Sequence, residues 1–142
     1  MAWTGQAPAV GDLVWCWFPH LPDKAPGPKP RPALVITVEV REDGVVATVV
    51  YGTSQGVGRL RAGEFAITKL ANPVAYELAG LSFDTKFNFK ASVALPWQET
   101  FFKVPPRPRS GQTPKLGTLH PSLLRAVEAA FRASTRERII SR

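Results

Sequence analysis

Few residues of the sequence are of a type that can carry out chemistry, and they form no metal site. Cys16, His20 and His120 are the only cysteine and histidine residues among the 142, and their spacings match no zinc motif. The sequence contains neither a phosphate-binding Gly-Lys-Ser loop nor a cluster of carboxylates that could hold two metal ions. We therefore expect chemistry without a bound metal ion or other cofactor.

Arg31 and Thr53 have side chains of types that could contact a phosphate group. The guanidinium of Arg31 stays charged at neutral pH and can bind a phosphate through two hydrogen bonds. The hydroxyl of Thr53, just after Gly52, could donate a hydrogen bond to a phosphate oxygen as charge builds on it. His20, in an expected loop, could act as an acid or base near neutral pH, whereas His120 at an expected helix start is interpreted as structural. From the residues alone, the alternatives are an exposed arginine, a turn threonine and a surface histidine.

The charge balance favours an anionic partner. Eighteen Lys and Arg residues stand against eleven Asp and Glu residues, which leaves a formal net charge of +7. Such a balance favours nucleic acid or an acidic protein as the partner. It does not distinguish a polyanion that is cut from one that is only bound.

Composition and length predict one domain over residues 1–142 in the cytoplasm. The hydrophobic fraction of 44% is normal for a globular protein and excludes general disorder. No apolar run approaches the roughly 18 to 20 residues of a membrane span, and the first residues do not resemble a signal peptide. A single cysteine suits a reducing compartment. We therefore expect no membrane contact.

The elements expected to position the candidate side chains are short strands. The run at 13–18 follows a turn-like Gly-Asp pair, and its β-branched and aromatic residues predict a strand that is apolar on both faces. Residues 19–30 contain five prolines and predict an exposed loop. Strands are predicted at 33–40 and 45–51, and the turn signal between them indicates a β-hairpin.

The second half of the chain has a weaker pattern. Residues 52–63 carry four glycines and predict a loop, and short strands are predicted at 65–70, 83–89 and 92–95. Residues 75–81 fit either a helical turn or coil. The alternation at 83–89 is expected to place four side chains on one half-buried face. These are Phe83, Thr85, Phe87 and Phe89.

A basic, proline-rich segment precedes a C-terminal helix. Residues 103–116 are interpreted as an insertion, either a solvated connector or a basic arm along the path of a ligand. A helix is predicted over 121–134, with Pro121 at its first position and one apolar stripe facing the core. The stripe comprises Leu123, Leu124, Val127, Ala130 and Phe131. The predicted fold is mainly β (α+β): short antiparallel strands that curl into a small barrel to avoid open edges, with the helix packed on it.

Several motifs follow one another at characteristic distances. Gly11-Asp12-Leu13-Val14-Trp15 opens the first strand, Arg31-Pro32-Ala33-Leu34-Val35-Ile36 opens the second, and Thr53-Ser54-Gln55 closes the third. Ala79-Gly80-Leu81 and Gly117-Thr118-Leu119 precede the helix. In this order the motifs resemble the MazF/PemK family of toxins. The resemblance covers roughly residues 9–133, with a looser match at 56–78.

The resemblance implies a specific biological role. Members of this family are toxins of type II toxin-antitoxin systems, with an SH3-like barrel, a C-terminal helix and usually a homodimeric assembly. The implied activity is a metal-independent endoribonuclease that cleaves single-stranded RNA by attack of the 2′-hydroxyl, leaving a cyclic phosphate and a 5′-hydroxyl. Cleavage would inhibit translation and growth. The implied partners are single-stranded RNA, a second copy of the chain and a cognate antitoxin with an acidic C-terminal segment.

The resemblance favours catalytic roles for Arg31 and Thr53, to which we add His20 as a candidate acid or base. Neighbouring basic and polar residues are predicted to bind the RNA backbone or a base. Trp17 is predicted to stack on an unpaired base, and Phe18 and Phe87 are further candidates with core packing as the alternative. The predicted RNA-binding residues are Lys29, Ser54, Gln55, Arg59, Arg61, Trp17 and Lys86.

The chain departs from the family in a few places, and other functions remain open. Some relatives carry an arginine and an aspartate in the strand at 83–88, where this chain offers Asp84 and Lys86 in an undetermined register. One alternative is a non-catalytic poison that traps a protein, as relatives that inhibit DNA gyrase do. Another is a barrel that binds RNA or protein without cutting. An open groove shared by Arg31 and Thr53 would favour the enzyme, whereas burial of either would favour a binder.

Overall fold

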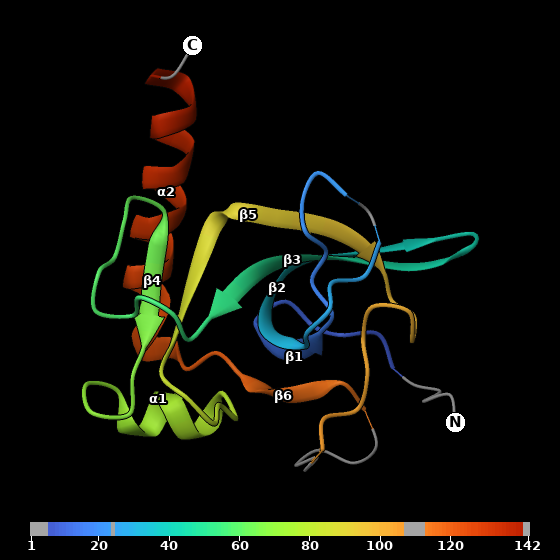
Figure 1. Ribbon diagram of the computed structural model, residues 1–142, viewed down its shortest axis with the longest axis horizontal. Helices are drawn as coiled ribbons and strands as arrows, with labels where there is room; N and C mark the ends of the chain where they lie inside the picture. The colour runs from blue at the N-terminus through green and yellow to red at the C-terminus, as the bar shows by residue number, and fades with distance from the viewer. Residues whose placement is uncertain (1–5, 24, 107–112, 141–142) are drawn as a thin grey trace.

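The strands form one antiparallel sheet with two helices against it. The computed structural model describes residues 6–23, 25–106 and 113–140, the last five of these by their backbone only. The six strands are β1 (Asp12–Cys16), β2 (Arg31–Arg41), β3 (Gly44–Thr53), β4 (Glu64–Ile67), β5 (Thr85–Pro96) and β6 (Lys115–Thr118). The helices are α1 (Pro73–Leu78) and α2 (Leu124–Ile140), and a 3₁₀ turn, Pro121–Leu123, leads into α2. Figure 1 shows α2 standing beside β4, with α1 below and the β2–β3 hairpin projecting on the other side.

The sheet is a half-barrel. Its strand order is β4-β5-β3-β2-β1-β6, and every neighbouring pair is antiparallel. The predicted mainly β fold with a helix packed on the strands is therefore confirmed. The curled sheet stays open, because β4 and β6 each pair with a single neighbour in the described part of the chain.

A hydrophobic core lies on each face of the sheet, which explains why the strands are apolar on both sides. Leu13 of β1 joins one cluster, and the flanking Val14 joins the other, as alternation along a strand requires. Residues from α1 and α2 cover the first cluster, for example Ala75 and Ala130. Phe102, from the segment after β5, covers the second.

The C-terminal helix packs with a stripe slightly different from the one predicted. Leu123, Val127 and Ala130 face the core, but Leu124 and Phe131 are about half exposed, which corrects their predicted burial. The buried position one turn further on is Ser134. These inward-facing residues follow one another at three- and four-residue spacing, as on one face of a regular helix, and Leu124 and Phe131 lie at the edge of that face. The helix also runs beyond the predicted end, to Ile140.

The helix start agrees with the structural reading of His120. The Nδ1 atom of His120 accepts a hydrogen bond from the backbone N–H of Ser122 at 3.0 Å. Pro121 follows at the first helical position, where a missing N–H costs nothing. Residues 75–81, which fitted either helix or coil, contain most of α1.

The strands predicted at 83–89 and 92–95 are a single bent strand. In the pairing of β5 with β3 the register jumps, from Val50 opposite Ser92 to Tyr51 opposite Asn88. Such a bulge bends a strand and increases its twist, and the bend of β5 is plain in Figure 1. Phe83 lies before the strand and is 72% exposed, so its predicted place on the buried face is wrong.

The two late motifs mark a close backbone contact between the end of α1 and β6. A Cβ atom on Gly80 would lie 2.0 Å from the carbonyl oxygen of Leu116, and one on Gly117 would lie 2.2 Å from that of Leu78. Gly80 also has a φ of +71°, which glycine adopts readily. Side chains at either position would therefore push β6 away from α1.

The predicted insertion at 103–116 is tied to the sheet at both of its ends. The backbone N–H of Lys103 donates to the carbonyl of Trp15 at 3.3 Å, and that of Trp15 donates to Pro114 at 2.8 Å. Its last two residues begin β6. Residues 107–112 of the segment lie outside the described residues.

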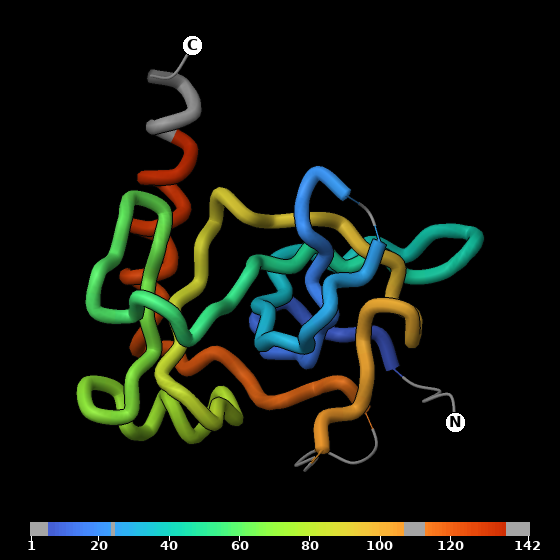
Figure 2. The backbone as a smooth tube through the Cα atoms, in the orientation of Figure 1, coloured from blue at the N-terminus to red at the C-terminus, as the bar shows by residue number. Residues whose placement is uncertain are grey.

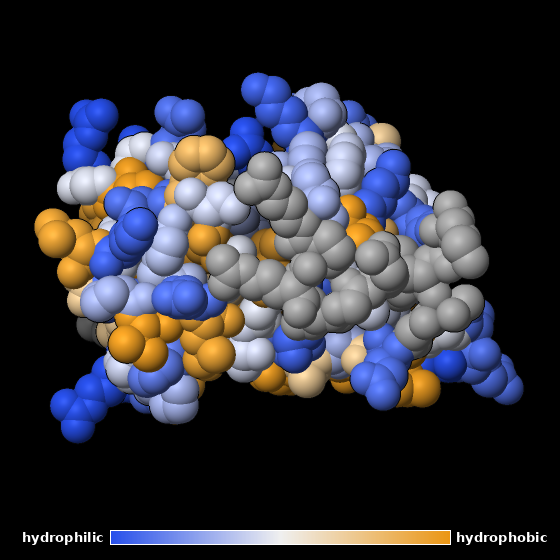
Figure 3. Space-filling model, turned by 90° about the horizontal axis from the view of Figure 1, so that it is seen from below, coloured by the Kyte–Doolittle hydropathy of each residue, from blue (hydrophilic) through white to orange (hydrophobic). Residues whose placement is uncertain are grey.

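One surface of the molecule is rich in exposed apolar side chains. Seen from below, these side chains gather over α1 (Figure 3). Leu70, Val74 and Leu78 follow one another at four-residue spacing there, and each is exposed. Neither helix, as far as it is described, is long and apolar enough to cross a lipid bilayer.

Candidate active site

The site lies where β2 begins and β3 ends. Ala33 of β2 pairs with Tyr51 of β3, so the antiparallel register continued by two residues brings Arg31 opposite Thr53. Gly52 makes this approach possible. A Cβ atom there would lie 2.4 Å from the carbonyl oxygen of Pro32 and 2.8 Å from the ring of Phe87. The Gly-Thr pair therefore has a structural reason, because only glycine lets the two strand ends close up.

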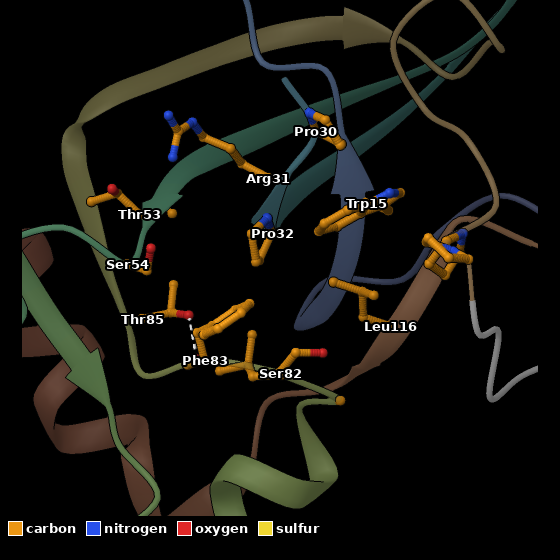
Figure 4. Close-up of a pocket in the computed structure, with 15 residues that line it drawn as sticks. Trp15, Pro30, Arg31, Pro32, Thr53, Ser54, Ser82, Phe83, Thr85 and Leu116 are labelled. Carbon is orange, nitrogen blue, oxygen red and sulfur yellow. Dashed lines mark hydrogen bonds between the residues drawn. The ribbon is translucent and has the colours of Figure 1, made fainter. Parts of the chain in front are cut away.

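Arg31 and Thr53 line one open cavity of about 720 Å³. Both side chains are partly exposed. Ser54 lies beside Thr53, while Trp15 and Leu116 form the opposite wall (Figure 4). The floor is closed by Ser82, Phe83 and Thr85. The predicted catalytic pair thus shares one cavity, the arrangement expected of an enzyme.

Arg31 also borders a second cavity, of about 400 Å³, whose lining does not include Thr53. His20, Lys29 and Tyr51 line this second cavity. The guanidinium carbon of Arg31 lies 5.5 Å from the centre of the Tyr51 ring, a distance at which a cation is attracted to an aromatic face. The structure therefore brings His20 and Lys29 together with Arg31, but in a cavity that Thr53 does not line.

The charge of Arg31 is not neutralised by a carboxylate of the described residues. Within the described residues no carboxylate forms an ion pair with Arg31, whereas Glu64, Asp12, Glu39 and Glu128 are each paired with another cation. Tyr51 orients the guanidinium without cancelling its charge. Arg31 is therefore able to bind an anion that enters either cavity.

The Thr53 hydroxyl is held by the backbone next to it. Its Oγ1 atom accepts a hydrogen bond from the N–H of Gln55 at 3.1 Å. Because a hydroxyl both accepts and donates, its proton remains available to a ligand oxygen. Gln55 therefore contributes to the site through its backbone, and its side chain lies outside the linings of both cavities.

Lys86, predicted to bind RNA, forms an ion pair within the protein. Its Nζ atom lies 3.0 Å from Oε1 of Glu64 and 3.3 Å from the carbonyl oxygen of Arg59. Glu64 also accepts a hydrogen bond from the backbone N–H of Arg61 at 2.7 Å. This ion pair holds the second half of the 54–63 loop, which runs beside α2 in Figure 2. The side chains of Arg59 and Arg61 are exposed on this loop and line neither cavity.

The aromatic residues have places that the sequence did not reveal. Trp17 is half-buried, with the Lys103 ammonium 4.9 Å from its ring centre, and it lines neither cavity. Phe18 and Phe87 are buried in the two cores. The aromatic residue that does line the first cavity from β1 is Trp15, opposite Pro32 in the register. The β1–β2 pairing selects Trp15 over Trp17, and sequence patterning does not set that pairing.

Neither a metal site nor a reactive thiol is found among the described residues. Among the described residues, no three His, Cys, Asp or Glu side chains are grouped so that they could hold a metal ion. Burial raises the pKa of the Cys16 thiol to about 12, because the charged thiolate is poorly solvated inside the protein. The thiol therefore stays protonated and unreactive near neutral pH.

Comparison with known proteins establishes the fold. No protein-family model matches the sequence, and neither does any curated protein. Among solved structures, the chain is similar to an endoribonuclease in complex with its cognate antitoxin from Mycobacterial species. The similarity covers 91% of this chain and 95% of that one, with a TM-score of 0.53 and 16% identity. The chain therefore has the fold of that endoribonuclease, as the resemblance of its motifs predicted.

Proposed function

We propose that the chain is the toxin of a type II toxin-antitoxin system and acts as a metal-independent endoribonuclease on single-stranded RNA. The observation that carries this proposal is the pairing of Arg31, which has no carboxylate partner among the described residues, with Thr53 in one open cavity. The net charge of +7 supports a polyanionic substrate. The fold shared with an endoribonuclease is consistent with it.

The proposed reaction uses a nucleophile that the RNA itself supplies. The 2′-oxygen attacks the adjacent phosphorus and loses its proton, a P–O2′ bond forms, and the P–O5′ bond breaks. The products are a 2′,3′-cyclic phosphate and a 5′-hydroxyl, whose oxygen takes up a proton. The protein must hold the phosphate in line for attack and stabilise the charge that builds on its non-bridging oxygens.

Arg31 and Thr53 both donate hydrogen bonds to the phosphate. Arg31 donates two hydrogen bonds from its planar guanidinium to the non-bridging oxygens. Thr53, whose oxygen already accepts from the Gln55 N–H, donates its hydroxyl proton to the same phosphate. His20, across Arg31 in the second cavity, is the candidate for proton transfer.

The RNA backbone is proposed to run past Arg31 from one cavity to the other. Lys29 in the second cavity binds the neighbouring phosphate, and Ser54 contacts the backbone beside Thr53. Arg59 and Arg61, exposed on the 54–63 loop, bind phosphates further along. We propose that an acidic segment of the antitoxin competes for this path, and that the active protein is a cytoplasmic homodimer.

The test is cleavage of a long single-stranded RNA by the purified protein in excess EDTA. Discrete fragments ending in a cyclic phosphate should form with the natural chain and be absent with Arg31→Ala. Arg41→Ala is the matched control, since Arg41 is an exposed arginine of the β2–β3 hairpin, paired with Glu39. RNA that stays intact across varied sequences would refute the proposal and favour a protein that binds without cutting.

A further inference from the structure

The first cavity has an apolar half that the proposed phosphate chemistry does not use. Arg31, Thr53 and Ser54 make up its polar side in Figure 4. Across from them lie Trp15 and Phe83, with Leu116 on the same wall as Trp15. Phe83 is 72% exposed, although its neighbour Leu81 is buried in the core. A large aromatic ring thus faces the solvent within a few residues of the core.

The exposed ring of Phe83 sits on a well-fixed piece of backbone. The hydroxyl of Thr85 donates to the carbonyl of Phe83 at 2.8 Å. The side chain of Asp84 accepts a hydrogen bond from the backbone N–H of Lys69, also at 2.8 Å. Since the backbone is ordered before any ligand arrives, a ligand that stacks on this ring loses little affinity to ordering the protein.

Trp15, on the wall that faces Arg31, offers an equally rigid surface. It lies in β1 opposite Pro32 of β2, its backbone N–H donates to the carbonyl of Pro114, and its own carbonyl accepts from the N–H of Lys103. Its side chain is partly exposed into the cavity. Two aromatic residues on separate elements therefore border one hollow beside Arg31.

We propose that this apolar half binds one unstacked RNA base, held by Phe83 and Trp15 while the adjoining phosphate lies at Arg31 and Thr53. The proposal rests on the proposed function, which it extends by assigning a base-binding subsite. Single-stranded RNA is commonly bound by splaying bases onto aromatic side chains. The cavity volume of about 720 Å³ is within the range of pockets that enclose small ligands, and one nucleoside is a ligand of that class.

Stacking in this subsite would help catalysis as well as affinity. An anchored base fixes the ribose next to it, and the 2′-hydroxyl of that ribose must lie in line with the breaking P–O5′ bond. Phe83 and Trp15 are therefore positioning residues for the reaction. Because every base has an aromatic face, stacking alone does not select one base.

The test measures whether Phe83 and a single base act together. A set of single-stranded RNA oligonucleotides of one sequence carries one abasic residue at each position in turn, and each is bound to the natural chain and to Phe83→Ala. All sugars carry fluorine in place of the 2′-hydroxyl, so that each oligonucleotide binds without being cut. We expect one abasic position to weaken binding to the natural chain about 5- to 150-fold, as loss of a stacking ring does, and to have no further effect on Phe83→Ala.

Two variants serve as controls. Phe83→Tyr keeps the ring and should retain affinity and the sensitivity to the abasic position. Leu70→Ala removes another exposed apolar side chain, outside the cavity lining, and should behave like the natural chain. Since the Phe83 side chain is largely exposed, Phe83→Ala is expected to fold normally.

The outcomes separate the subsite from the ribonuclease activity. Binding that depends jointly on Phe83 and one base, in a protein that does not cut the corresponding all-ribose RNA, would support the subsite and refute the proposed activity. Cleavage of that RNA with no coupling to Phe83 at any position would overturn the subsite and leave the activity standing. A protein that binds no RNA at all would overturn both.

Discussion

Arg31 and Lys86 are two cations placed on either side of Thr53 in the sheet, yet their surroundings are opposite. Lys86 pairs directly with Thr53 in the register of β3 and β5, and Arg31 lies opposite Thr53 on β2. The Lys86 side chain is 12% exposed and bonded to Glu64, which is itself 7% exposed. Arg31 lines two cavities and is paired with no carboxylate of the described chain.

The difference separates a charge that is available to a ligand from a charge that is engaged within the protein. In a buried ion pair each charge is compensated by the other, so the ammonium of Lys86 is poorly available to a phosphate. It fixes the 54–63 loop, which starts directly after Thr53. Arg31 is oriented by the neutral ring of Tyr51 and keeps its full charge for a ligand. Arg31 and Lys86 have the same formal charge, but their different surroundings predict different effects of mutation.

The largest effect is expected from Arg31→Ala. Loss of the donors that stabilise developing charge typically lowers kcat by about 100- to 1000-fold, and we expect the upper end because Arg31 supplies two hydrogen bonds. The free energy of unfolding should change by no more than about 0.5 kcal/mol, since the Arg31 side chain is partly exposed and forms no ion pair with the described residues. Single-turnover cleavage and urea unfolding measure the two quantities. A large drop in the urea concentration at the unfolding midpoint, together with the lost activity, would show that Arg31 has a structural role instead.

Lys86→Met should show the reverse pattern. Removal of one partner leaves Glu64 buried and uncompensated, and breaking a buried pair in this way costs about 3 kcal/mol or more of unfolding free energy. The double variant Lys86→Met with Glu64→Leu should recover most of that stability. We expect the single variant to bind RNA more weakly, and the double variant to bind as weakly, because in both the hydrogen bond from Lys86 to the 54–63 loop is lost. Full recovery of affinity in the double variant would argue against a positioning role.

These two residues also show how far the sequence alone leads. The sequence singles out Arg31 because its motif opens a strand and resembles a family motif, and because its residue type suits phosphate binding. Lys86 has the same formal charge, and its pairing with Glu64 depends on β4 lying beside β5, a contact between residues 22 positions apart. No local pattern predicts such a contact. The strands, the hairpin and the C-terminal helix follow from alternation and turn residues, which are local.

The candidate site was predictable in its polar half and missed in its apolar half. Arg31, Thr53 and Ser54 belong to motifs that remain contiguous in the chain. Phe83 was assigned to a buried face because the alternation of β5 was extended two residues too far. Trp15 lies in β1 opposite Pro32, whereas Trp17 follows the end of that strand and packs beside Lys103. Tertiary placement therefore decided which aromatic residues border the cavity.

Thr53→Val tests the neutral residue between the two cations. Valine has nearly the same shape but lacks the hydroxyl, so we expect kcat to fall about 100-fold with a smaller change in KM, as for loss of one transition-state donor. Thr53→Ser keeps the hydroxyl and should recover most of the activity. The Thr53 oxygen also accepts from the Gln55 N–H, so hydrogen exchange at that amide reports any loosening of the turn. A valine variant with unchanged kcat would remove Thr53 from the catalytic pair.

Lys29→Ala should give the smallest effect, and it extends the comparison to a third cation. Lys29 is exposed at the second cavity, so its expected role is a solvated phosphate contact, unlike the tight binding of Arg31 and the buried pair of Lys86. We expect affinity to fall only a few fold for every RNA sequence. The slope of log affinity against log salt should become shallower by about 0.7, the value for one phosphate contact on a single strand. Lys69→Ala is the matched control, because Lys69 is an exposed lysine outside both cavity linings. An unchanged slope in Lys29→Ala would mean that the RNA does not reach the second cavity, and the path past Arg31 would then have to leave by another direction.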